Sequence, residues 1–252
     1  MRRFVSSVMV LILGLIFAGC ASADDTTTSL HIAAASSLTE VFNEIGAQFL
    51  RDNPDIAITF NFASSSDLAL QISQGLPADV FASADVKNMA KVTDAGLLEG
   101  QPTAFATNSL EIVVEKGNPL HIVSLAQLTT PGLLFVTCPI EVPIGRYTAE
   151  VLRNAGVTVT PASLEENAKG ILTKVTLGEA DAGIVYRTDI LAAGSSVTGV
   201  PIADKINVNP LYVVGTLRDS HAKEATQRFI DLLNSDQGRE KLSKFGFGLL
   251  PA

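Results

Sequence analysis

Short apolar runs of strand length alternate along the chain with stretches in which apolar residues recur every three or four positions. Residues 30–35 are an example of the first pattern and residues 38–53 of the second. The same alternation continues through a strand at 55–62, a helix at 67–74, a strand at 80–82 and a helix at 85–95. Strands and helices in this order predict a parallel sheet with helices packed on it.

A second unit of the same kind follows. The pattern predicts strands at 110–114, 133–136, 157–160 and 182–185, helices at 145–155, 168–177 and 187–193, and a short helical segment between Pro119 and Pro131. The chain then closes with a strand at 210–215 and helices at 221–234 and 236–245. No flexible linker separates the units, so we expect the chain to enter the second unit near 108–110 and to return near 212–216.

These crossings predict a two-lobed α/β fold in which each lobe is a mostly parallel sheet flanked by helices. Residues 24–109 and 214–252 would form the first lobe, and residues 110–213 the second. Ligands of such sheets bind at the carboxyl ends of the strands. We therefore expect the ligand in the cleft between the lobes.

Residues 1–23 have the character of an export signal. Arg2 and Arg3 precede an apolar run at 8–17 that is too short to span a bilayer as a stable anchor. Cleavage after Ala23 would release a soluble periplasmic protein, whereas cleavage before Cys20 would leave a lipidated cysteine at the new N-terminus. We favour the lipoprotein, held at the outer face of the cell membrane, because a cysteine directly after the apolar run is otherwise hard to explain.

The composition narrows the class of partner. The chain has 252 residues, 47% of them hydrophobic, so it can bury a sizeable core. Its formal net charge of −8 argues against nucleic acid, which is bound with an excess of Lys and Arg. An anionic ligand would have to be held by local dipoles and hydrogen bonds. Cys138 has no partner if Cys20 is removed or lipidated, and we expect it to be a small buried hydrophobe.

Two strand–helix junctions in the first unit are rich in hydroxyl groups. Ser36 and Ser37 follow three alanines, and Ser64, Ser65 and Ser66 stand between a strand and a helix. Serine at such a place is also a common helix cap. The first backbone N–H groups of a helix have no intrahelical partner, so hydroxyls and amides together make an anion site out of neutral groups.

The second unit offers three more junctions. VPIGRY at 142–147 and EENAKG at 165–170 each open a helix, with free amides expected near Ile144, Gly145 and Ala168. In AGIVYR at 182–187, Tyr186 ends a buried strand, where its hydroxyl can enter the cleft as a donor. Arg146 is a tempting counter-ion, but we expect its side chain to point to solvent.

Catalytic signatures are absent from the sequence. It has no G-x-S-x-G, G-x-x-x-x-G-K-[ST], G-x-G-x-x-G or H-E-x-x-H motif. Its three histidines lie too far apart along the chain for a metal-ligand pattern. An exported hydrolase using Ser37 or Ser65 as nucleophile would need a base within reach, and none is evident. We therefore predict no enzyme activity, no cofactor and no directly bound metal cation.

Six sequence blocks resemble the molybdate-binding proteins of bacterial ABC transporters, in the same order: AAASSL, FASSSDLALQI, GLPADVFASAD, VPIGRY, ENAKGIL and GEADAGIVYRTD. The resemblance runs from about residue 30 to the KFGF near the C-terminus. It implies a periplasmic-binding-protein fold and a molybdate or tungstate oxyanion in the cleft. It further implies delivery to a membrane permease, and we expect the protein to be a monomer.

The resemblance also implies which groups hold the anion. The family's donors fall on the Ser37, Ser65 and Tyr186 hydroxyls and on the backbone amides of Ile144 and Ala168, with Ser36 and Gly145 as secondary candidates. The family usually has alanine in place of Ile144 and valine in place of Ala168, which preserves a main-chain donor but can alter the pocket. Sulfate, another anion or a small organic acid remains an alternative ligand.

Overall fold

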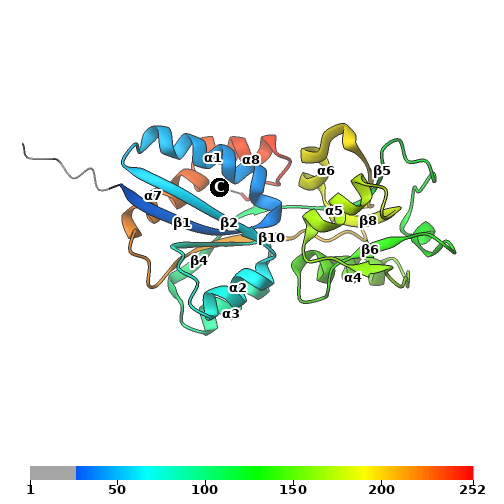
Figure 1. Ribbon diagram of the computed structural model, residues 1–252, viewed down its shortest axis with the longest axis horizontal. Helices are drawn as coiled ribbons and strands as arrows, with labels where there is room; N and C mark the ends of the chain where they lie inside the picture. The colour runs from blue at the N-terminus through cyan, green and yellow to red at the C-terminus, as the bar shows by residue number, and fades with distance from the viewer. Residues whose placement is uncertain (1–26, 252) are drawn as a thin grey trace, which may run out of the picture.

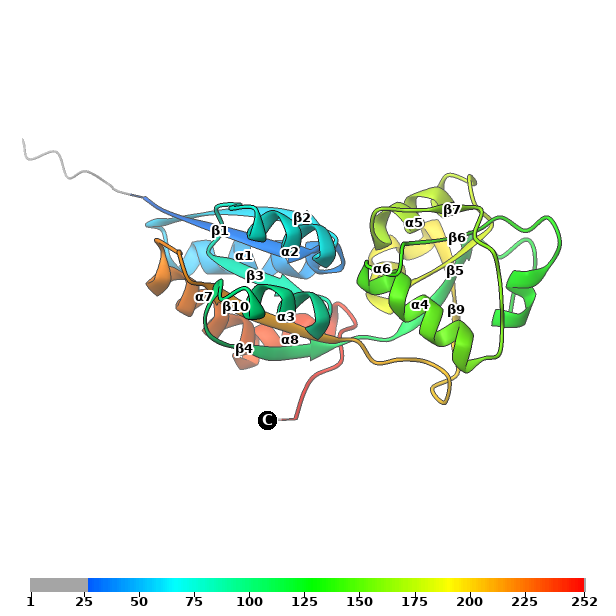
Figure 2. The same ribbon diagram turned by 90° about the horizontal axis from the view of Figure 1, so that it is seen from below.

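A computed structural model describes residues 27–251 of the chain. They form two lobes that lie side by side and are joined by crossing segments (Figures 1 and 2). The predicted two-lobed α/β fold is confirmed, with one five-stranded sheet in each lobe. Within residues 27–251, no helix has the length and apolar character needed to cross a membrane.

The first lobe contains both ends of the described chain. Its sheet has the order β2-β1-β3-β10-β4 and consists of β1 (Thr28–Ala35), β2 (Ile56–Ala63), β3 (Val80–Ser83), β4 (Leu98–Thr107) and β10 (Leu211–Leu217). Its helices are η1 (Ser36–Leu38), α1 (Thr39–Asp52), α2 (Ser65–Ser73), α3 (Val86–Asp94), α7 (Lys223–Asn234) and α8 (Asp236–Lys244). Figure 1 shows α1, α7 and α8 on one face of the sheet and α2 with α3 on the other.

The second lobe repeats this plan with a sheet of order β7-β6-β8-β5-β9. Its strands are β5 (Leu110–Glu115), β6 (Phe135–Thr137), β7 (Ser163–Leu164), β8 (Ala182–Tyr186) and β9 (Val197–Pro201). Its helices are η2 (Leu125–Thr129), α4 (Pro143–Asn154), α5 (Ala168–Thr176), α6 (Arg187–Ala193) and η3 (Gly194–Ser196).

In each sheet three neighbouring strands are parallel, and the fourth strand runs antiparallel to them. The fourth strand is β10 in the first lobe and β5 in the second. Each is the strand that enters its lobe from the other one. Because such a strand starts at the cleft, it must run away from the edge at which the parallel strands end. Both sheets therefore present the carboxyl ends of their parallel strands to the same cleft.

The chain crosses between lobes at residues 108–109 and returns at residues 202–210. The predicted boundary after residue 213 falls inside β10, all of which lies in the first sheet because its residues pair with β3 and β4. The crossings are bonded to each other. The Asn108 N–H donates to the Pro210 carbonyl at 3.1 Å, and the Leu110 N–H donates to the Asn207 side-chain oxygen at 3.2 Å.

Several short elements differ from the prediction. The segment 157–160 is not a strand, and the edge strand next to β6 is instead β7, which is two residues long. The strands β4 and β9 were not predicted. Gly100 and Pro102 interrupt the apolar pattern of β4, and Gly199 interrupts that of β9. Edge positions tolerate such residues because only one side of the strand needs partners.

An aromatic cluster fills the core between the first sheet and its covering helices. Phe42 of α1 is fully buried, and its ring centroid lies 5.7 Å from that of Phe229, 6.1 Å from that of Phe105 and 6.3 Å from that of Phe60. Phe229 belongs to α7, so the cluster joins the C-terminal helices to the start of the chain.

We expect Phe42→Ala to lower the free energy of unfolding by about 3–5 kcal/mol, because it removes buried surface and leaves a cavity beneath α1. Urea denaturation followed by circular dichroism measures the change. Leu70→Ala is the matched control, since Leu70 is 57% exposed and its loss should change stability by no more than about 0.5 kcal/mol. A loss below about 1 kcal/mol for Phe42→Ala would contradict the central role of this cluster.

Candidate functional site

A small cleft lies where the two sheets face each other. Its volume is about 10 Å³, close to the smallest cavity that holds one water molecule. No side chain that lines it carries a charge at neutral pH. Both lobes contribute to the lining, which consists of Ala35, Ser36, Ser37, Ala63, Ser64, Ser65, Ala84, Val142, Pro143, Ile144, Asn167, Ala168 and Tyr186.

The N-terminal ends of five helical segments meet at this cleft. They are η1 and α2 from the first lobe and α4, α5 and α6 from the second, each following the end of a strand or a short turn after it. Helix N-termini carry partial positive charge and N–H groups without intrahelical partners. The cleft is therefore favourable for negative charge although it contains no cation.

Ser37 is held by a chain of hydrogen bonds. The Asn108 side-chain amide donates to the Tyr212 hydroxyl at 3.3 Å, and the Tyr212 hydroxyl lies 2.8 Å from Ser37 Oγ. Either hydroxyl can be the donor of this last bond. With the Tyr212 hydroxyl as donor, Ser37 Oγ accepts within the protein and the Ser37 proton is left for the cleft.

The Ser65 hydroxyl is also held by a hydrogen bond from within the protein, in this case from a backbone N–H. Its Oγ accepts a hydrogen bond from the Ala84 N–H at 3.0 Å, and the residue is 1% exposed. No acceptor within the described residues binds the Ser65 hydroxyl proton, which leaves that proton to the cleft. Both serines are thus neutral donors with a fixed oxygen position.

Tyr186 ends β8 with a hydroxyl group that has no hydrogen-bond partner within residues 27–251, although the oxygen is buried. Its ring packs edge-on against Tyr212, with centroids 5.9 Å apart. Burial raises the pKa of Tyr186 well above its ordinary value, so the phenol keeps its proton. Leaving a buried polar group without a partner costs about 1–3 kcal/mol, so this hydroxyl is a strong indication of a missing acceptor.

Two backbone donors come from α4 and α5. In α4 the first intrahelical bond is made by the Arg146 N–H, which donates to the Val142 carbonyl at 3.0 Å, so the Ile144 N–H lies ahead of the hydrogen-bonded ladder. In α5 the first N–H group to bond is that of Gly170, which donates to the Asn167 side-chain oxygen at 3.1 Å. The Ala168 N–H therefore also precedes the hydrogen-bonded part of its helix. The cleft lining includes both Ile144 and Ala168.

The two secondary candidates differ in position. Ser36 lines the cleft, and Gly145 does not. A Cβ atom at Gly145 would lie 2.1 Å from the Pro139 carbonyl oxygen and 2.4 Å from that of Cys138. Gly145 therefore allows α4 to pack closely on the segment that follows β6.

Sequence reasoning anticipated a serine cap at the start of α2 but missed the other polar residues that support the donors. Ser64 caps α2 by accepting from the Asp67 N–H at 3.2 Å, and Asn167 caps α5 by accepting from the Gly170 N–H at 3.1 Å. Asn108 and Tyr212 lie far from Ser37 along the chain. The two caps could have been predicted, because serine and asparagine are preferred residues at the start of a helix. The contact between Ser37 and Tyr212 could not, because no pattern near either residue indicates it.

Charged residues stay outside the cleft lining and bridge the lobes. The expectation that Arg146 points to solvent is wrong. Its Nη2 atom lies 2.5 Å from Asp85 Oδ2, and Asp85 is the fully buried N-cap of α3 in the other lobe. The other carboxylate oxygen of Asp85, Oδ1, accepts a hydrogen bond from the backbone N–H of Asn88. This bond fixes the carboxylate in the orientation in which Oδ2 binds the guanidinium of Arg146. A second pair between lobes joins Lys169 Nζ to Glu40 Oε1 at 2.7 Å.

No group of three His, Cys, Asp or Glu side chains within residues 27–251 could hold a metal ion. Cys138 is a free thiol that is 2% exposed, which confirms its expected burial. Burial raises the pKa of the Cys138 thiol, which keeps it protonated. Cys20, the predicted lipid anchor, lies outside the described residues.

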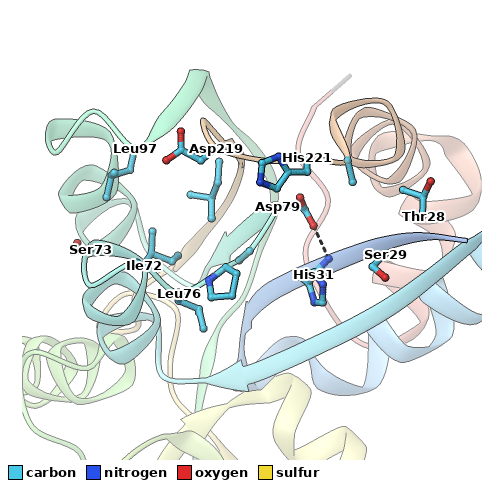
Figure 3. A pocket seen from close by; sticks show the side chains of 15 residues that line it. Thr28, Ser29, His31, Ile72, Ser73, Leu76, Asp79, Leu97, Asp219 and His221 are labelled. Atoms are coloured by element: carbon cyan, nitrogen blue, oxygen red, sulfur yellow. Dashed lines mark hydrogen bonds between the residues drawn. The ribbon is translucent and has the colours of Figure 1, made fainter. Parts of the chain in front are cut away.

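A far larger cavity, of about 610 Å³, lies at the opposite edge of the first sheet (Figure 3). His31, Asp79 and His221 line it, and the Asp79 carboxylate accepts a hydrogen bond from the backbone N–H of His31 at 2.7 Å. This edge carries the amino ends of the parallel strands and not the strand–helix junctions. The small cleft is therefore the candidate site, despite its size.

Two lobes that meet over a cleft lined by neutral side chains have the architecture of a solute-binding protein. Sequence comparison then gives the family. A sequence model described as "Bacterial extracellular solute-binding protein" matches residues 30–248, so the chain belongs to that family.

Two relatives and one solved structure illustrate the likeness. The chain is 41% identical to the molybdate-binding protein ModA of Mycobacterium tuberculosis over 219 residues, covering 87% of this chain and 84% of that protein. It is 30% identical to ModA of Escherichia coli, covering 98% of each. The structure of the periplasmic molybdate-binding protein of Azotobacter vinelandii superposes with a TM-score of 0.78 at 19% identity, covering 88% of this chain and all of that one.

Proposed function

We propose that this protein captures molybdate, and tungstate with it, outside the cytoplasm and delivers the anion to the permease of an ABC transporter. The observation that carries the proposal is the buried Tyr186 hydroxyl without a partner, in a cleft where every other polar group is also a neutral donor or helps to fix one. The ModA relatives support the choice of anion.

The chemistry of the lining favours an anion without a proton. Molybdate and tungstate are fully deprotonated dianions near neutral pH, so they need donors only. Phosphate keeps a proton near pH 7 and would require an acceptor such as a carboxylate, and no carboxylate lines the cleft. Sulfate carries the same charge as molybdate and can be distinguished only by its shorter bonds.

Five groups would share the anion's oxygens. The hydroxyls of Ser37, Ser65 and Tyr186 would each donate one hydrogen bond, as would the N–H groups of Ile144 and Ala168. The first two belong to one lobe and the other three to the second, so the anion would tie the lobes together. Closure would then present one continuous surface to the permease.

A thermal-shift panel of sodium molybdate, tungstate, sulfate and phosphate tests the choice of anion. We expect molybdate and tungstate to raise the unfolding temperature strongly, corresponding to about 4 kcal/mol when ligand exceeds Kd about 1,000-fold. Sulfate and phosphate should give much smaller shifts. A shift with sulfate and none with molybdate would select the sulfate-binding alternative.

Replacing Tyr186 by phenylalanine tests the donor set. Tyr186→Phe removes one donor to a charged ligand and should weaken molybdate binding by about 1.5–3 kcal/mol, measured by calorimetry. Tyr147→Phe is the comparison variant, because Tyr147 does not line the cleft and its hydroxyl donates to the Ala84 carbonyl at 3.5 Å instead. It should weaken binding less than Tyr186→Phe. Equal affinity of the Tyr186→Phe variant and the unaltered protein would exclude Tyr186 from direct contact.

We also propose that the mature protein begins at a lipidated Cys20 and is held at the outer face of the membrane. The support is the position of this cysteine directly after the apolar run of the export signal. Intact-mass measurement of the protein purified from a membrane fraction should show an acylated N-terminal cysteine. A mass that corresponds to a chain starting at Asp24 would select the released form instead.

A further inference from the structure

One ammonium group is shared by carboxylates from both lobes beside the cleft. Lys169 Nζ of α5 lies 2.7 Å from Glu40 Oε1 of α1 and 3.6 Å from Asp189 Oδ1 of α6. Lys169 and Asp189 belong to the second lobe and Glu40 to the first. The Glu40 contact therefore exists only while the lobes are together, whereas the Asp189 contact lies within one lobe.

Asp189 is an unusual carboxylate because it is 1% exposed and only partly bonded. Its Oδ2 atom accepts the Tyr186 N–H at 3.3 Å, but Oδ1 has no hydrogen-bond partner within the described residues. Five titratable groups interact electrostatically with the Asp189 carboxylate, and each comes from a different part of the fold. They are Lys169, Glu40, Tyr186, Tyr212 and Cys138.

We propose that Asp189 binds a proton when the lobes close on the anion, so that this protein couples anion capture to proton uptake. The inference rests on the proposed function. A proton from solvent joins the Oδ1 atom, which accepts no hydrogen bond within the described residues and lies 3.6 Å from Lys169 Nζ, and no other bond forms or breaks. With both carboxylates ionised, the cluster has one positive and two negative charges next to a dianion site. Protonation of Asp189 makes the cluster neutral.

The direction of the coupling follows from what closure does to Asp189. Burial, with a smaller contribution from Glu40, raises the pKa of Asp189 to about 6 against the opposing effect of Lys169. Opening withdraws Glu40 and admits water, so the pKa falls back toward its ordinary value of 3.8. The closed form thus binds the proton more tightly. Affinity for the anion should rise as pH falls through about 6 and level off below the pKa of the open form.

Calorimetry with sodium molybdate at pH 6.5, in buffers of different ionisation enthalpy, measures the protons taken up per anion bound. We expect net uptake of a fraction of one proton, and an affinity that increases about twofold in total between pH 8 and pH 6 and then by up to about tenfold (about 1.4 kcal/mol) per pH unit below pH 6. Asp189→Asn keeps an acceptor for the Tyr186 N–H but cannot titrate. It should bind molybdate with no proton uptake and a flat pH profile.

Two further variants make the assignment specific. Glu40→Gln should reduce the uptake, since the group that raises the Asp189 pKa on closure is removed, and it serves if Asp189→Asn fails to fold. Glu44→Gln is the matched control, because Glu44 lies one turn further along α1 and contacts only Lys241 and Lys244 of its own lobe. It should leave the uptake unchanged.

The outcomes separate the two proposals. Molybdate binding without proton uptake between pH 5.5 and 8 would overturn the role of Asp189 and leave the proposed function standing. Uptake that persists in Asp189→Asn, or that is insensitive to Glu40→Gln, would place the proton elsewhere and also overturn it. Failure of the unaltered protein to bind molybdate at any of these pH values would overturn the proposed function itself.

Discussion

Donors that have no partner inside the protein are the constraint on which this structure depends. A site that holds an anion without a cation needs N–H and O–H groups that are buried, correctly aimed and unused by the fold. Such groups are costly in the empty protein, and Tyr186 shows the cost most clearly because its buried hydroxyl has no partner in the described chain. The remainder of the fold can be understood as the means of holding these groups in position.

The sheet topology brings the donors together. Helices that follow parallel strands begin at the carboxyl edge of the sheet, so one sheet alone places several helix N-termini along one line. Two sheets facing each other double the number and surround a ligand. That arrangement requires the chain to cross at residues 108–109 and again at 202–210, and the antiparallel strands β5 and β10 are its direct consequence.

Charge is kept close to the cleft but out of its lining. The pairs Arg146–Asp85 and Lys169–Glu40 join the lobes at the cleft without contributing to the surface that would touch a ligand. Each pair has its acid on the first lobe and its base on the second. The pairs therefore favour closure by attraction between lobes, while the lining of the cleft stays neutral. In an acidic protein this separation avoids placing a carboxylate against the anion.

The alternation of strands and helices, the two-lobed plan and the serine-rich junctions around Ser37 and Ser65 could be predicted, because each depends on residues that are close along the chain. Tyr186 could also be predicted from its place at the end of a buried strand. In contrast, Arg146 contacts Asp85, 61 residues away, and Tyr212 holds Ser37 across 175 residues, and no local pattern indicates either contact. The edge strands β4, β7 and β9 likewise depend on pairing with strands that are distant in the sequence. Periodicity reports which face of an element is buried, but not which distant residue meets it, and that choice is made only when the two lobes are in place.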